Sequence, residues 1–148
     1  MSPPRRARRA ADVRTGASGR LLAVLAYVAL IFTLSSWQHP PSGPEIEHLD
    51  KVAHTIEYAG LGVVLFRAVE LRFRGGRLTA AVVLLGILVA TADEVYQWTI
   101  PGRQSTAADA AADLLGVALG AGWMQWRRRC SGQEPAETWQ RRGQGRDE

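Results

Sequence analysis

The sequence contains very little cysteine and lysine. Cys130 is its single cysteine, so no disulfide can form within the chain and a metal site built on cysteine ligands is excluded. Lys51 is its only lysine, and arginine supplies the other 17 of its 18 basic residues. The chain also lacks the G-x-S-x-G, H-E-x-x-H and P-loop patterns. These common catalytic signatures therefore give no support to an enzymatic function.

Charge is nearly absent from four long stretches in the middle of the chain. Residues 21–37, LLAVLAYVALIFTLSSW, hold no charged residue and would span about 25 Å as a helix. Further apolar runs cover residues 52–69, 78–98 and 107–126, with breaker-rich segments between them. The first run is long for a signal peptide, and no A-x-A-like cleavage site follows it. We predict an all-α integral membrane bundle of about four transmembrane helices.

The charges are concentrated instead at the two ends and in one connection. Residues 1–20 hold six arginines and residues 127–148 hold another six. Both ends are rich in Gly, Pro and Ser and show no apolar periodicity, so we expect two disordered tails around a membrane domain at residues 21–126.

Arginine placement predicts the orientation of the bundle. The connection between the second and third runs carries Arg72, Arg74 and Arg77, whereas the other two connections hold only Lys51 and Arg103. The positive-inside rule then makes both termini cytoplasmic and turns the other two connections outward. Because topology already requires these arginines, we expect contact with membrane lipid and no nucleic acid.

Polar residues form stripes on three of the expected helices. On the second, polar residues recur at i, i+4, i+7 and i+8, namely Asp50, His54, Glu57 and Tyr58. Asp93 and Gln97 share one face of the third helix. Asp109 and Asp113 do so on the fourth, where Gly116 and Gly120 form a small-xxx-small surface for close helix packing. The first helix has no stripe and is expected only to pack.

Three acids, Glu57, Asp93 and Asp113, lie at similar depth, about 21–24 Å above the basic rim. An ionisable residue inside a membrane indicates a functional site by default. We therefore expect a polar pocket open to the outside and capped by the loop of residues 101–103. The sequence leaves open whether Asp93 or its neighbour Glu94 points inward.

At these residues the chain resembles the VanZ-like family, small multi-pass bacterial membrane proteins named for a teicoplanin-resistance protein. The segments DKVAHTIEYAGLG and DEVYQWTIPGRQSTAADAAADLLGVALG carry the resemblance. The matching residues are Asp50, Lys51, His54 and Tyr58 in the first block, Glu94, Gln97, Pro101, Gly102 and Arg103 in the second, and Asp109, Gly116 and Gly120 in the third. The family often has Asn at the position of Asp113, so this chain adds an ionisable group there. The resemblance implies glycopeptide tolerance in some members and leaves the molecular activity open.

Several hypotheses follow for the pocket. The candidate residues are Asp50, Lys51, His54, Glu57, Tyr58, Asp93, Glu94, Gln97, Arg103, Asp109 and Asp113. Our first hypothesis is binding without chemistry, in which Lys51 and Arg103 hold the phosphate or carboxylate of an envelope lipid, cell-wall precursor or drug. A membrane-embedded enzyme with His54 as general base is the alternative. The simpler reading makes Asp50 the N-cap of the second helix and Asp109 an acid near the positive end of the fourth helix.

Other functions receive less support from the residues. A transporter would use acids at one depth as a proton relay, but about four short helices leave little room for a transport path unless the protein forms an oligomer. One histidine with carboxylates is a poor zinc site, and Lys51 disfavours a hard cation. We therefore expect no metal and no cofactor.

Overall fold

The structure, a computed structural model, consists of four α-helices. They are α1 (Arg5–Ser35), α2 (Pro44–Val69), α3 (Gly75–Gln97) and α4 (Ala107–Cys130). It describes the backbone of residues 5–36, 44–101 and 106–131, and the side chains of residues 16–36, 51–101 and 106–131. No strand occurs in these segments. The predicted all-α fold is confirmed.

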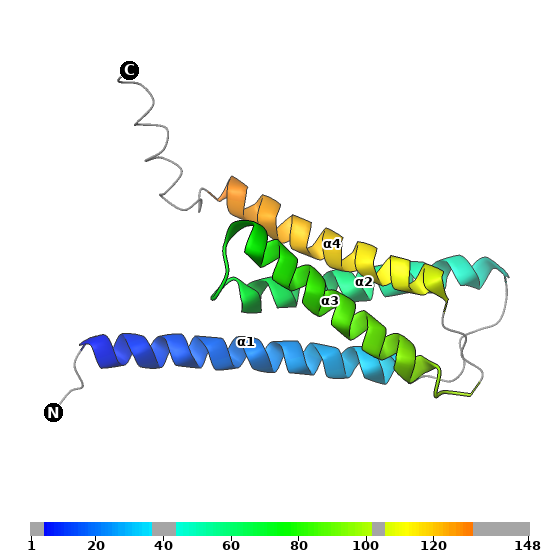
Figure 1. The fold of residues 1–148 in the computed structure, drawn as a ribbon, viewed down its shortest axis with the longest axis horizontal. Helices are drawn as coiled ribbons and strands as arrows, with labels where there is room; N and C mark the ends of the chain where they lie inside the picture. The colour runs from blue at the N-terminus through cyan, green and yellow to red at the C-terminus, as the bar shows by residue number, and fades with distance from the viewer. Residues whose placement is uncertain (1–4, 37–43, 102–105, 132–148) are drawn as a thin grey trace, which may run out of the picture.

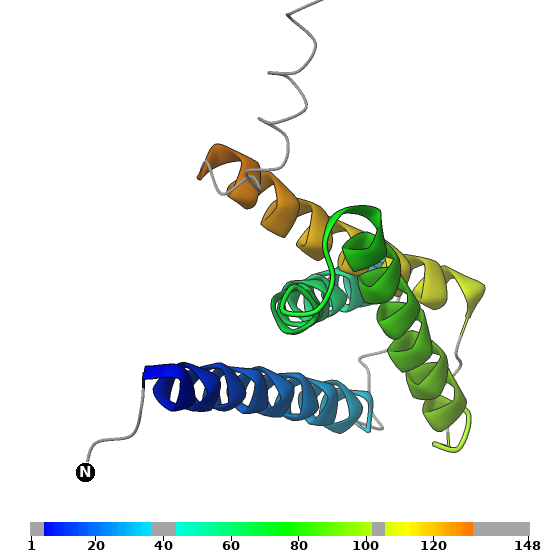
Figure 2. The same ribbon diagram turned by 60° about the vertical axis from the view of Figure 1, so that its left-hand side comes forward.

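Consecutive helices run in opposite directions, and α2 lies between α1 and α4 (Figures 1 and 2). The start of α1, the α2–α3 connection and the end of α4 therefore gather at one end of the bundle (Figure 1). We call this the basic end, because Arg20, Arg67 and the arginines at positions 72–77 and 127–129 lie there.

Three of the helices are long and apolar enough to cross a membrane. The spans are Gly16–Ser35, Lys51–Val69 and Gly75–Gln97. The fourth helix is not among them, and it carries two aspartates and three arginines. A membrane crossing by α4 therefore stays a prediction.

Two boundaries differ from the sequence prediction. Residues 5–20, expected to be disordered, continue α1 as helix. Arg and Ala make up much of this segment and both have high helix propensity. At the other end α4 extends past residue 126 to Cys130 through three arginines, which interact favourably with the negative end of the helix dipole. The rest of the predicted C-terminal tail lies outside the described residues.

The exterior of the bundle is apolar. Large aliphatic side chains point outward on all four helices, with Leu22 67%, Ile56 68%, Leu84 66% and Leu115 55% exposed. Soluble monomeric proteins rarely expose large contiguous apolar surfaces, whereas hydrocarbon solvates them at no cost. This surface fits a lipid environment.

Glycines bring α2 and α4 into close contact. An added Cβ at Gly116 would overlap the backbone carbonyl oxygen of Thr55, and one at Gly120 would overlap that of Ala59. Neither position could hold a larger residue without separating the helices. The close approach predicted from GVALG is confirmed.

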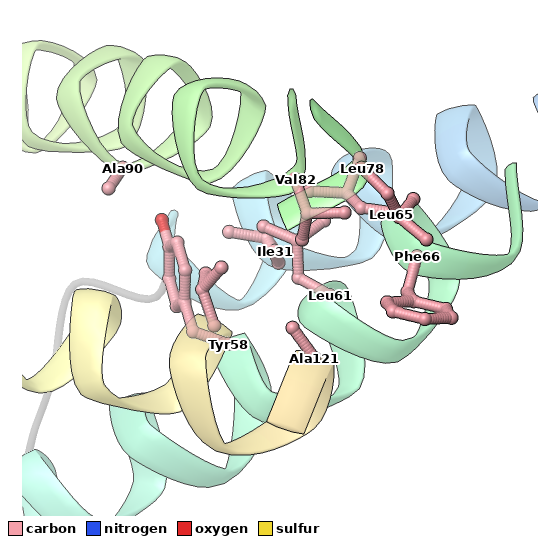
Figure 3. Packing of buried hydrophobic residues seen from close by; sticks show 10 residues of the cluster. Ile31, Tyr58, Leu61, Leu65, Phe66, Leu78, Val82, Ala90 and Ala121 are labelled. Carbon is pink, nitrogen blue, oxygen red and sulfur yellow. The ribbon is translucent and has the colours of Figure 1, made fainter. Parts of the chain in front are cut away.

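An apolar core occupies the middle of the bundle (Figure 3). Its buried members come from all four helices and are Ile31, Tyr58, Leu61, Leu65, Phe66, Leu78, Val82, Ala90, Val117 and Ala121. Tyr58 directs its hydroxyl group toward α3 (Figure 3). Beyond this hydroxyl the interior becomes polar.

Candidate functional site

Seven residues with polar groups are buried at the end of the bundle opposite the basic end; one of them, Asp109, lies at the start of α4, and the other six form a cluster. This polar cluster consists of Ser35 on α1, His54 and Tyr58 on α2, Asp93 and Gln97 on α3, and Asp113 on α4. The side chains of Asp93 and Asp113 are 0% exposed. A carboxylate in such an apolar protein interior is costly unless it is paired or hydrogen-bonded. The partners of these two acids therefore decide what the cluster can do.

Asp93 is held by neutral donors from three helices. Its Oδ2 atom accepts hydrogen bonds from Ser35 Oγ at 2.9 Å, Gln97 Nε2 at 2.8 Å and Tyr58 Oη at 3.4 Å. Gln97 lies one turn after Asp93, so the i, i+4 spacing aligns the two side chains. These donors fix one carboxylate oxygen in place without supplying a positive charge.

Asp113 pairs with the only buried imidazole in the described part of the chain. His54 Nδ1 lies 2.9 Å from Asp113 Oδ1, and the two side chains are 6% and 0% exposed. A carboxylate at one ring nitrogen sets the tautomer and the orientation of the imidazole. The pair also joins α2 to α4, one helical turn before the glycine contact at Gly116.

Each buried aspartate keeps one oxygen without a hydrogen-bond partner within the described segments. These atoms are Asp93 Oδ1 and Asp113 Oδ2, and Glu94 Oε1 is in the same condition. Leaving a buried acceptor unsatisfied costs about 1–3 kcal/mol, and more if the group is charged. Such atoms are rare in proteins and commonly mark a bound ligand, water or a catalytic role. The cluster therefore retains capacity to accept hydrogen bonds.

The structure distinguishes the neighbouring acids Asp93 and Glu94. Asp93 faces the interior, as the i, i+4 pairing with Gln97 indicated. Glu94, which the family pattern singles out, is half-buried beside it with one buried oxygen. Asp93 is therefore the member of the polar cluster, and Glu94 lies at its margin.

Asp109 has a structural role at the start of α4. It forms a capping box with Thr106, in which Asp109 Oδ2 accepts from the Thr106 backbone N at 3.0 Å and from Oγ1 at 2.7 Å. Its other oxygen, Oδ1, lies 3.9 Å from Lys51 Nζ. This agrees with the simpler reading of Asp109 and places the cation Lys51 near the cluster.

The remaining candidate residues are placed less completely. Arg103 lies outside the described residues, as does the side chain of Asp50. Glu57 is half-buried, and its backbone carbonyl accepts a hydrogen bond from Tyr27 Oη at 2.9 Å. The proposed pairing of Lys51 with Arg103 around an anion therefore stays a prediction.

The contribution of α1 to the polar cluster was not predicted from the sequence. We expected this helix only to pack, but Ser35 donates to Asp93 and Ser36 Oγ lies 2.8 Å from the hydroxyl of Tyr96. The expectation was wrong because the two serines form no helical stripe. The Ser35-Ser36 pair at the end of an otherwise apolar run was the available signal.

An ion-pair network at the basic end was not predicted from the sequence either. Glu70 Oε1 lies 2.8 Å from Arg20 Nη1, and Glu70 Oε2 pairs with Arg128 Nη2. These contacts join α1, the end of α2 and α4. Glu70 is the only acid within the arginine-rich segment 67–77, and this isolation could have indicated its role.

No group of three or more His, Cys, Asp or Glu side chains that could hold a metal ion occurs in the part of the chain that the structure describes. What the cluster offers is one acid–imidazole pair, one acid held by neutral donors and two open acceptor oxygens.

Comparison with known proteins gives one result. A model of the VanZ/LLP1 family matches residues 6–128, which cover nearly all of the four helices and every member of the polar cluster. No curated protein and no solved structure gives a significant match. The family match agrees with the apolar exterior and the three membrane-length helices. The chain therefore belongs to the VanZ/LLP1 family and is a multi-pass membrane protein.

Proposed function

We propose that the polar cluster binds the headgroup of an anionic envelope lipid, a lipid-linked cell-wall precursor or a glycopeptide drug in the plasma membrane of a bacterium. Binding of this kind would contribute to envelope homeostasis or glycopeptide tolerance. The observation that carries the proposal is the pair of open acceptors, Asp93 Oδ1 and Asp113 Oδ2, on two fully buried carboxylates.

The ligand must satisfy these oxygens with hydrogen-bond donors. Hydroxyl, amide and ammonium groups can do so, and sugar–peptide headgroups carry many of them. A hydrogen bond to a charged group contributes about 1.5–3 kcal/mol, so two such contacts would support useful affinity. The donors already bound to Asp93 Oδ2 hold the carboxylate ready, which lowers the ordering cost of binding.

Lys51 supplies a positive charge near the cluster. Its side chain is 35% exposed and lies 3.9 Å from Asp109 Oδ1, so it remains accessible to an incoming phosphate or carboxylate. In our proposal Arg103, which follows α3 in the sequence, is the second cation. The positive-inside rule would place this end of the bundle at the outer leaflet, where wall precursors and glycopeptides meet.

A titration of the purified full-length protein tests the proposal. A lipid-linked cell-wall precursor and a teicoplanin-type glycopeptide are titrated separately, and binding is followed by native mass spectrometry. Asp93→Asn keeps an acceptor for Ser35 and Gln97 but turns the open oxygen into a donor, so affinity should fall about tenfold or more. Lys51→Gln should weaken binding of the anionic precursor by a similar factor.

Glu70→Gln is the matched control, because it neutralises an acid at the opposite end of the bundle. It should bind as wild type does. Failure of the wild type to bind either compound, or equal affinity of wild type and Asp93→Asn, would rule out this function.

The His54–Asp113 pair favours one alternative, a membrane-embedded enzyme. An aspartate that orients an imidazole at 2.9 Å is the arrangement used in general acid–base catalysis. Incubation of the lipid-linked precursor with the protein, followed by product analysis, distinguishes the two functions. Conversion that His54→Gln abolishes would establish the enzyme, whereas binding without conversion supports the binding function.

A further inference from the structure

A groove lies between α1 and α2 at the basic end, remote from the polar cluster. Its walls are formed by Gly19, Arg20, Ala23, Val63, Val64 and Arg67. The first three belong to α1 and the others to α2, and all six fall within the spans Gly16–Ser35 and Lys51–Val69. The groove therefore opens toward the lipid at the arginine-rich rim of the membrane domain.

The charges around the groove are predominantly positive. Arg20 is fixed by Glu70 at 2.8 Å and by the backbone carbonyl of Arg67. Glu70 shares its single charge with Arg128 as well, so Arg20, Arg67 and Arg128 face one acid: three positive charges against one negative leave a net charge of +2. Arg67 is exposed and forms no ion pair within the described segments. An anion is needed to balance this end of the groove.

The rest of the groove is apolar. Val63 and Val64 are half-buried, Ala23 is exposed, and an added Cβ at Gly19 would meet no atom within 4 Å. This lining suits a hydrocarbon chain lying along the two helices. A small soluble anion would leave it uncovered.

We propose that this groove binds one anionic phospholipid of the surrounding bilayer, with its phosphate between Arg20 and Arg67 and an acyl chain along Ala23, Val63 and Val64. Arginine suits this role because its guanidinium group donates several hydrogen bonds to phosphate oxygens. The Arg20–Glu70 contact holds one guanidinium at the mouth of the groove. The lipid would contact both α1 and α2 on the side where Arg20 pairs with Glu70.

Native mass spectrometry tests the site on the full-length protein, delipidated and then exposed to phosphatidylglycerol or phosphatidylcholine. Wild type should retain one phosphatidylglycerol and little phosphatidylcholine. Arg67→Gln removes the positive charge and leaves a shorter, neutral polar side chain, and it should weaken retention about fivefold. Ala23→Phe fills the apolar part without changing charge and should weaken retention of the same lipid.

Arg77→Gln is the charge-matched control, because Arg77 is exposed at the same basic end but does not line the groove. It should change retention less than about twofold. An equal loss of phosphatidylglycerol retention in Arg67→Gln and Arg77→Gln would show that the basic end attracts anionic lipid only in general, and would overturn the proposed site. Unchanged retention in Ala23→Phe would also overturn it. None of the three substituted residues belongs to the polar cluster, so retention of phosphatidylglycerol in this experiment does not depend on the proposed function.

Discussion

The polar cluster and the basic end use similar residues in opposite ways. At the basic end one acid meets arginines in excess, and both oxygens of Glu70 are paired at partly exposed positions. In the polar cluster acids are in excess and fully buried, and Asp93 and Asp113 each keep one open oxygen. A satisfied ion-pair network mainly joins helices, whereas a buried and incompletely satisfied cluster retains the capacity to bind. The variants below test this difference, from the largest expected effect to the smallest.

Removing His54 should have the largest effect on stability. His54→Ala leaves the buried Asp113 without this hydrogen-bond partner, which costs about 1–3 kcal/mol and more if the acid is charged, and the lost imidazole also leaves a cavity. Thermal unfolding of the protein in detergent measures the loss. His54→Gln retains a side-chain donor and should recover part of the stability. A loss of stability in His54→Ala no larger than that in Glu70→Gln would contradict the difference between the polar cluster and the basic end.

Disrupting the glycine contact between α2 and α4 should cause the next largest loss of stability. Gly120→Ala pushes α4 away from the carbonyl of Ala59 and should destabilise the protein by about 1–3 kcal/mol, as overpacking does. Gly122→Ala is the control, since an added Cβ there meets nothing within 4 Å and alanine favours helix. The two variants should differ clearly in unfolding temperature. Equal temperatures would contradict the close packing of α2 and α4.

Ser35→Ala should cost less, about 1 kcal/mol, because Gln97 and Tyr58 still donate to Asp93. Thr33→Ala provides a control on the same helix, since its hydroxyl bonds only to the carbonyl of Ala29 and is exposed. Denaturant unfolding of both variants measures the difference. If Thr33→Ala were the more harmful change, α1 would not contribute to the cluster as described.

Glu70→Gln should have the smallest effect, about 0.5 kcal/mol, because Arg20 and Arg128 are about one-third exposed and water screens the pair. The loss should shrink further at high ionic strength, where salt screens exposed charges. Unfolding at low and at high salt measures this. A large loss of stability that does not depend on salt would show that water does not screen Glu70, and the contrast with Asp93 and Asp113 would fail.

Local patterns predicted most of the fold. Four apolar runs separated by Pro and Gly indicated four helices, and the GVALG motif indicated the α2–α4 contact because only small residues permit it. The start of α1 at Arg5 was not predictable in the same way. Its arginines and alanines favour helix, while its charge and nearby prolines suggest disorder, and composition alone does not decide between them.

The polar cluster was predictable only where its residues share a helix. The spacing of His54 and Tyr58, and of Asp93 and Gln97, placed these pairs on common faces. The contacts of Ser35 with Asp93 and of Arg20 with Glu70 join residues 58 and 50 positions apart. Such contacts depend on how helices pack, and a single sequence carries no periodic signal for them.

The most direct test of the central claim is mass spectrometry of the lipids that co-purify with the full-length protein after gentle extraction from native membranes. Wild type, Asp93→Asn and Thr33→Ala, whose exposed side chain belongs to neither the polar cluster nor the groove, are compared at equal protein amounts. We predict at least one lipid species that accompanies wild type and Thr33→Ala and is lost from Asp93→Asn. The same set of lipids with all three proteins would contradict a binding role for the polar cluster.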